Sequence, residues 1–155
     1  MSRINDILSG FETAIRANST FQYANIFQRE ELEGDEAPDT VSVYVYPGKP
    51  RANQVSDGTV FRVYPVNVLI LRKITGRALN ENETDVVTQD KASDNDAMIT
   101  ALDTTRPAGA NTISGVYQTD WIDSDLNFQQ SFKHKSGEEN LYRILQIWEA
   151  HTYES

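Results

Sequence analysis

The sequence Val60-Phe-Arg-Val-Tyr-Pro-Val-Asn-Val-Leu-Ile-Leu-Arg-Lys-Ile74 is the longest apolar and β-branched stretch of this chain. From Val66 onward both alternating sets of side chains are largely apolar, which is typical of a strand with both faces covered. Pro65 has no backbone N–H, so it predicts a bulge or an unpaired edge that bends the strand. We therefore expect residues 60–74 to form the central strand of a sheet.

The segment before this strand predicts an antiparallel hairpin. Residues 40–46 alternate valine with serine and tyrosine, the period of a half-buried strand. Residues 47–58 are rich in turn formers and predict a long hairpin tip, and loops longer than a turn requires are often functional. The tip also carries two basic residues in an acidic chain. We expect it to contact a partner through Lys49, Arg51, Asn53 and Asp57.

Two helices are predicted. Residues 3–17 place apolar side chains at helical spacing, which predicts an amphipathic helix that Ser2 can cap and that covers one face of the sheet. A second, shorter helix is predicted to begin after Ser93 or Asp94 as its cap, to place its apolar face within residues 97–102 and to stop before Pro107, because the polar region before it has little to bury.

Short strands are predicted within residues 21–28 and 113–121. The carboxyl end fits either a helix or a strand, and its β-branched and aromatic residues favour a strand over 142–153 that pairs with residues 128–133. The chain therefore predicts a single α+β domain over residues 1–155. Its sheet is mainly antiparallel with about five strands, and it carries an N-terminal amphipathic helix and a second, shorter helix.

Composition excludes several functions. The chain has 155 residues and no cysteine, which excludes zinc–thiolate sites, iron–sulfur clusters and thiol nucleophiles, and fits a reducing cytoplasm. Its formal charge of −9 argues against affinity for nucleic acid. The amino terminus lacks the apolar core of a signal peptide, and no apolar run is long enough to span a membrane. We expect a soluble, unprocessed protein.

The sequence contains no recognisable catalytic, metal-binding or phosphate-binding motif. Residues 123–127 begin like a calcium loop, but Phe128 stands where glycine is needed and His134 where glutamate is needed. His134 and His151 have no ligand or nucleophile at a spacing that marks a site. No glycine-rich phosphate loop or nucleophile elbow is present. We therefore expect no catalytic residue, no cofactor and no metal.

The order of elements resembles the tail terminator, or tail completion, proteins of tailed bacteriophages, which are related to the lambda-type minor tail family. The resemblance covers nearly the whole chain. It is carried by the N-terminal helix, the short strand near Ile26, the valine strand, the long hairpin tip, the strand 62–72, one helix near residue 98 and the closing strands. The polar insertion over residues 80–96 departs from it.

This resemblance implies a non-enzymatic structural protein of the virion, assembled in the host cytoplasm as a ring, typically a hexamer. The ring caps the tail tube and joins it to the head. The implied partners are copies of the chain itself, the tail tube protein and a head-completion or connector protein. No specific nucleic-acid binding and no membrane are implied.

Two other functions remain open at this stage. One is a small-ligand-binding or enzymatic module with a curved sheet and an aromatic-lined pocket. The other is a monomeric acidic adaptor that binds a basic partner through residues 30–36, which carry five acids and otherwise predict a solvated loop. The pocket would be lined by Tyr44, Tyr46, Phe61, Tyr64 and Trp148.

Overall fold

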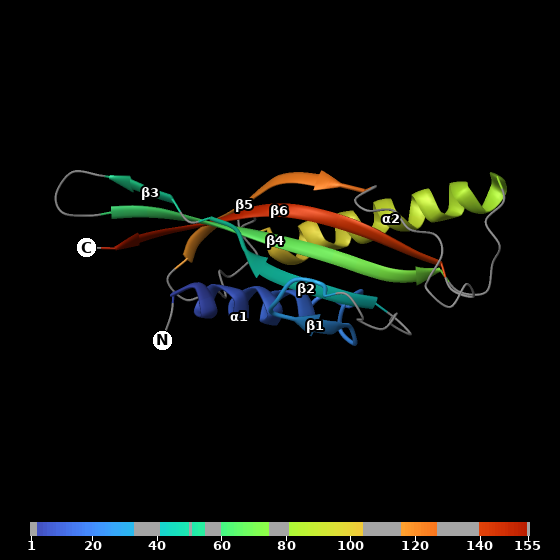
Figure 1. The fold of residues 1–155 in the computed structure, drawn as a ribbon, viewed down its shortest axis with the longest axis horizontal. Helices are drawn as coiled ribbons and strands as arrows, with labels where there is room; N and C mark the ends of the chain where they lie inside the picture. Colours follow the sequence, from blue (N-terminus) through green and yellow to red (C-terminus); the bar gives the residue numbers. More distant parts are fainter. Residues whose placement is uncertain are drawn as a thin grey trace.

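A computed structural model of the protein shows two helices and six strands among the residues that it describes. It describes residues 3–32, 41–49, 51–54, 60–74, 81–103, 116–126 and 140–154. The elements in chain order are α1 (Arg3–Arg16), β1 (Asn25–Phe27), β2 (Val41–Pro47), β3 (Arg51–Gln54), β4 (Val60–Ile74), α2 (Glu81–Leu102), β5 (Val116–Asp125) and β6 (Asn140–Glu154) (Figure 1).

All of these strands belong to one sheet, in which β4 is central. The strand order is β1-β2-β4-β6-β5, and β3 pairs with β4 beyond the end of β2. Every pairing is antiparallel except that of β1 with β2. The α+β class, the mainly antiparallel sheet and the N-terminal amphipathic helix are therefore confirmed.

The carboxyl end is a strand, as its composition predicted. β6 pairs with β4 without a register shift from Val60 opposite Glu154 to Ile74 opposite Asn140. On its other side β6 pairs with β5. The expected partner segment, residues 128–133, lies outside the described residues, so the described hairpin partner of β6 is β5.

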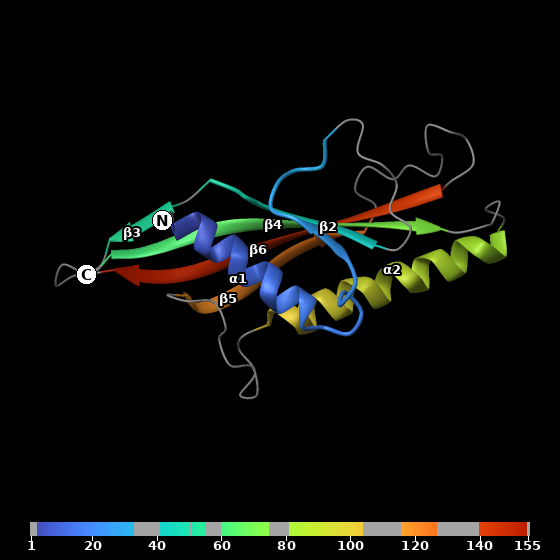
Figure 2. The ribbon, with the colours of Figure 1, turned by 90° about the horizontal axis from the view of Figure 1, so that it is seen from below.

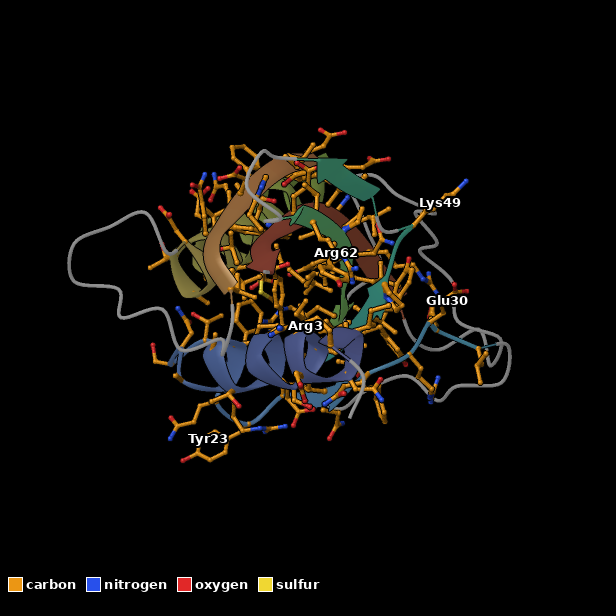
Figure 3. All side chains as sticks on the ribbon, turned by 90° about the vertical axis from the view of Figure 1, so that its left-hand side faces the viewer. Arg3, Tyr23, Glu30, Lys49 and Arg62 are labelled. Atoms are coloured by element: carbon orange, nitrogen blue, oxygen red, sulfur yellow. The ribbon has the colours of Figure 1, made fainter. Side chains whose placement is uncertain are left out.

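Both helices cover the same side of the sheet, which we call the helix face, and the sheet arches over α1 (Figure 3). The opposite side is called the outer face. Because side chains alternate along a strand, the two faces of β4 bury different sets of residues. The helix face holds the main core, which includes Phe11, Ile15, Val43, Val68, Ile70, Met98, Ile144 and Trp148.

The outer face of β4 is also apolar, as expected for a covered strand. Leu69 and Leu71 are buried there beside Tyr44. The ring of Tyr44 stacks on that of Phe27 with centroids 5.1 Å apart. The Arg29 guanidinium lies 4.8 Å from the Phe27 ring centroid, a cation–π distance. The segment that follows β1 therefore packs against the outer face.

The bulge predicted at Pro65 of β4 is found in the neighbouring chain segment that connects β2 to β3. Val66 pairs with Pro47 and Val63 pairs with Arg51, so one extra residue lies on the β2–β3 side. Gly48 begins this connection, and its N–H donates to the Pro65 carbonyl at 2.8 Å. A Cβ at Gly48 would lie 2.8 Å from Pro65 Cβ, so the position needs glycine.

The second helix is longer than predicted. α2 begins at Glu81 and has 22 residues, against 14 in α1, so the expectation of a shorter helix capped by Ser93 or Asp94 is wrong. Asp94 lies inside the helix and is buried. The physical reason is that the side of α2 that packs on the sheet is partly polar. A search for apolar residues at helical spacing therefore does not detect the full helix. This side of the helix forms a stripe of buried residues, Lys91, Asp94, Asn95, Met98 and Leu102.

Part of the predicted hairpin tip is also a strand. Residues Arg51–Gln54 form β3 and continue the hairpin along β4, from Arg51 opposite Val63 to Gln54 opposite Val60. These residue types have little intrinsic strand preference, so pairing with β4 decides the conformation. β3 and the adjoining ends of β4 and β6 project beyond α1, and we call this three-stranded extension the β arm (Figures 1 and 2).

Candidate functional site

Three of the four residues predicted to contact a partner lie along the β2–β3 edge, at the base of the β arm. Lys49 follows β2 and is exposed, and its side chain extends outward from the rim of the sheet (Figure 3). Arg51 and Asn53 belong to β3, opposite Val63 and Phe61. Asp57 lies outside the described residues. The structure therefore places Lys49, Arg51 and Asn53 on one edge of the sheet.

A second constellation, which sequence reasoning missed, lies between α2 and the sheet. The Arg72 guanidinium donates from Nε to Asp94 Oδ2 at 2.6 Å and from Nη2 to Asp94 Oδ1 at 2.9 Å. The Tyr142 hydroxyl donates to Asp94 Oδ2 at 2.6 Å. Lys91 Nζ lies 5.9 Å from the centroid of the Tyr142 ring. A buried carboxylate with three donors is fully paired, so this group fastens α2 to β4 and β6.

The environment of this cluster shifts the pKa values of its members. Burial raises the pKa of Tyr142 well above its ordinary value of 10.0, and the charge of Asp94 and the hydrogen bond to it act in the same direction. Burial acts to lower the pKa of Arg72, but the hydrogen bond and charge of Asp94 outweigh it, so that this pKa is raised. Burial lowers the pKa of Lys91. Tyr142 therefore keeps its proton in the folded protein at pH values where an unfolded tyrosine loses it.

Replacing Tyr142 with Phe tests this shift. The hydrogen bond to a charged group is worth about 1.5–3 kcal/mol at neutral pH, so Tyr142→Phe is expected to lower the free energy of unfolding by that amount. Because the folded-state pKa is raised, the contribution is complete below about pH 10 and is lost as pH rises, by about 1.4 kcal/mol per pH unit. Urea unfolding of both proteins between about pH 7 and pH 11 measures the difference.

The lowered pKa of Lys91 acts in both proteins, so it cancels when the two unfolding curves are subtracted. A difference between wild type and Tyr142→Phe that stays constant across this pH range would show that Tyr142 ionises as it does in the unfolded chain.

A network of amides continues the attachment of α2 to the sheet. Gln146 is fully buried, and its Nε2 donates to the Asn95 carbonyl at 3.0 Å and to Asn95 Oδ1 at 2.8 Å. Trp148 Nε1 donates to Gln146 Oε1 at 2.8 Å. Thr119 Oγ1 donates to the Leu102 carbonyl at 2.6 Å. The buried polar groups of α2 thus find partners on β5 and β6.

Charged side chains gather on the outer face of β5 and β6. His151 Nε2 lies 3.0 Å from Asp120 Oδ2 and 3.8 Å from Glu149 Oε1. Gln118 Nε2 donates to Asp120 Oδ1 at 2.6 Å. In the part of the chain that the structure describes, no three His, Cys, Asp or Glu side chains are placed to hold a metal. His134 lies outside the described residues.

The acidic segment after β1 makes an internal ion pair. The Arg143 guanidinium donates from Nε to Glu31 Oε1 at 2.9 Å and from Nη2 to Glu31 Oε2 at 3.0 Å, and both side chains are mostly buried. Glu31 therefore serves to hold this segment on the sheet. Residues 33–36, which carry other acids of the predicted adaptor surface, lie outside the described residues.

The aromatic side chains expected to line a pocket lie on different faces of the sheet. Tyr44 belongs to the apolar cluster of the outer face, whereas Tyr64 and Trp148 belong to the core on the helix face. A crevice between α1 and the end of β2 is too narrow to hold a water molecule. It is lined by Ile4, Ile7, Leu8, Pro47, Gly48, Tyr64, Pro65 and Val66.

β5 occupies one end of the strand order and carries two large exposed apolar side chains. Trp121 is 49% exposed and Ile122 is 51% exposed. The register against β6 shifts between Trp121 and Asp123, so Ile122 lies in a bulge. Trp121 Nε1 donates to Ser124 Oγ at 2.9 Å. The sequence predicts a strand within residues 113–121, but it does not indicate that Trp121 is exposed and Trp148 is buried.

The chain matches no model of a known protein family and no curated protein sequence. Within the described residues, neither helix has the length and apolar character needed to cross a membrane.

Proposed function

We propose that this protein is a structural component of a phage virion, similar to tail terminators. In this proposal several copies form a closed ring, hexameric by the resemblance, that caps the tail tube and joins it to the head connector. The protein contributes shape and binding surfaces, and no catalysed reaction. Its partners are its own copies, the tail tube protein and a head-completion or connector protein, and its location is the virion.

The β arm is the observation that carries this proposal. A subunit of a ring needs surfaces that reach a neighbour, and the arm extends the hairpin past the helix-covered part of the sheet (Figure 1). The element order that motivated the resemblance supports it as well, from α1 through the valine strand β2 and the extended hairpin to the closing strands β5 and β6.

Charge also supports the proposal. A ring through which DNA passes works best if its wall does not trap the phosphate backbone, and a subunit with a formal charge of −9 repels it. The exposed Lys49 and the β3 residue Arg51 stand out against this acidic background. In the proposal they contact an acidic surface of a neighbouring subunit or of the tube.

The full-length protein is expected to form a closed ring of several subunits. Analytical ultracentrifugation measures the mass, and negative-stain electron microscopy shows the ring. Lys49→Glu/Arg51→Glu is expected to abolish the ring and the joining of tails, because it replaces two cations on the arm edge with anions that the neighbouring acidic surface repels.

A matched control introduces the same change in net charge elsewhere. Glu at four exposed positions of α2 is expected to leave the ring intact, and the positions are Gln89, Ala92, Ser93 and Thr100. A wild-type chain that stays monomeric at high concentration would contradict the proposed function. A ring that survives Lys49→Glu/Arg51→Glu would instead contradict the role of these two residues.

A further inference from the structure

The edge that β3 and the end of β2 form beyond β1, which we call the arm edge, differs in charge from the edge that β5 forms on the other side of the sheet. The arm edge carries Lys49 and Arg51. The β5 edge carries Asp120, Asp123 and Asp125 within one strand. The strand order places β3 on the β2 side of β4 and β5 beyond β6, so these edges lie on opposite sides of one molecule. A single chain therefore cannot bring them together, whereas two copies can.

The β5 edge is shaped for contact through side chains. Its register against β6 shifts twice, between Val116 and Gln118 and between Trp121 and Asp123. Bulges on an edge strand disfavour pairing with the backbone of another chain and redirect side chains. Here the second bulge contains Ile122, which is about as exposed as its neighbour Trp121.

The composition of this edge fits a basic partner. Trp is a frequent anchor of protein interfaces, and its ring face attracts ammonium and guanidinium groups. Asp123 lies next to this apolar pair and is exposed. Asp120 lies on its other side, 3.0 Å from His151 Nε2. In the register of β5 and β6, Asp120 and Asp123 pair with Glu149 and Ile147 on the outer face, whereas Trp121 pairs with Trp148 on the helix face. The edge of β5 therefore offers carboxylates on one side and an exposed indole on the other, and together they complement an edge that carries Lys or Arg.

We propose that the β arm edge of one copy docks on the β5 edge of the next copy, with Lys49 and Arg51 against Trp121, Ile122 and Asp123. The contact is head-to-tail, because each copy contacts one neighbour through its arm and the other neighbour through its β5 edge. Such contacts generate closed rings when the rotation between successive subunits adds up to a full turn. This inference rests on the proposed ring and deepens it by naming the two surfaces that join its subunits.

The test uses two charge-reversed forms of the full chain. The arm variant is Lys49→Glu/Arg51→Glu, and the edge variant is Asp123→Lys/Asp125→Lys. Each alone places like charges at every contact, so each is expected to lose the ring and sediment as a monomer. In an equimolar mixture the acidic arm of one variant meets the basic edge of the other, and every remaining contact is native. The mixture is therefore expected to recover rings in which the variants alternate.

A single substitution tests the apolar anchor. Trp121→Ala is expected to weaken subunit association about 30-fold, the effect of losing a central interface anchor. Tyr23→Ala is the control, because Tyr23 is 82% exposed and points away from the sheet (Figure 3). It is expected to leave association unchanged.

The outcomes separate this inference from the proposed function. Rings formed by either charge-reversed variant alone would overturn the contact while leaving the proposed ring in place. A mixture that fails to recover rings would also overturn the contact, provided that circular dichroism shows both variants folded. A wild-type chain without rings would overturn the proposed function itself, and the contact with it.

Discussion

Replacing Asp94 with Ala is expected to lower the free energy of unfolding by about 3–5 kcal/mol, the usual cost of removing one partner from a buried ion pair. The carboxylate accepts two hydrogen bonds from Arg72 and one from Tyr142. Its loss leaves the Tyr142 hydroxyl and the partly buried guanidinium without these acceptors, and α2 loses its attachment to β4. Urea unfolding, at a protein concentration where the chain is monomeric, measures the change.

Asp96 provides a matched control on the same helix. It is exposed, so Asp96→Ala is expected to change the free energy of unfolding by less than about 0.5 kcal/mol.

Replacing the whole cluster separates the cost of leaving buried groups unpaired from the net contribution of the cluster to stability. Arg72→Met/Asp94→Leu/Tyr142→Phe removes the carboxylate together with its two described donor residues, so it is expected to be closer to wild type in stability than Asp94→Ala. Equal losses for Asp94→Ala and Asp96→Ala would show that the buried ion pair does not hold α2.

Trp148→Ala is expected to lower the free energy of unfolding by about 3–5 kcal/mol, because it removes the largest fully buried side chain among the residues that the structure describes. The indole is 1% exposed, and its N–H donates to the buried Gln146 amide. The substitution leaves a cavity on the helix face and removes one partner of Gln146. Thermal and urea unfolding of the monomer measure the loss.

The sheet supplies its own control for this substitution. Trp121 lies directly opposite Trp148 in the register of β5 and β6, but 49% of its surface is exposed. Trp121→Ala is expected to cost the monomer less than about 1 kcal/mol. If the two substitutions destabilised the monomer equally, Trp121 would belong to the core, and its assignment to a subunit contact would lose its basis.

The elements that could be predicted from sequence are those that bury apolar side chains at a regular period. α1 presents an apolar stripe to the sheet, and β2 and β4 carry runs of valine, isoleucine and leucine. β6 is harder to predict from sequence, because its alternation is weak. Half-buried Leu145 and Ile147 on the outer face lie between the buried residues of the helix face. Its β-branched and aromatic composition still indicated a strand.

The elements that the sequence did not reveal depend on partners distant along the chain. The N-terminal part of α2 and its polar stripe escaped detection because Lys91, Asp94 and Asn95 are helix-face residues only in combination with Arg72, Tyr142 and Gln146. Their spacing was a usable signal, since it is that of one side of a helix. β3 depends likewise on β4 for its conformation.

The candidate site also has one part that the sequence reveals and one part that depends on the folded structure. The basic residues of the hairpin could be found from sequence, because Lys49 and Arg51 lie among turn formers in an acidic chain. The opposing surface could not be found, because the exposure of Trp121 and Ile122 depends on a bulge and on the position of β5 in the strand order. The site as a pair of surfaces therefore emerges only from the topology.

The pairing of β4 with β6 has a consequence for how the chain acquires its structure. β4 can fold early with β2 and β3 as a local hairpin, but β6 is synthesised after every other described helix and strand. Until then one long side of β4 exposes unpaired N–H and C=O groups beside valine, isoleucine and leucine, a template for aggregation. Bringing β6 to β4 also closes the long chain segment between them, which contains α2 and β5. This closure carries an entropic cost that slows folding. Assembly in the cell therefore begins from a nascent polypeptide whose β4 edge needs protection until β6 has been synthesised.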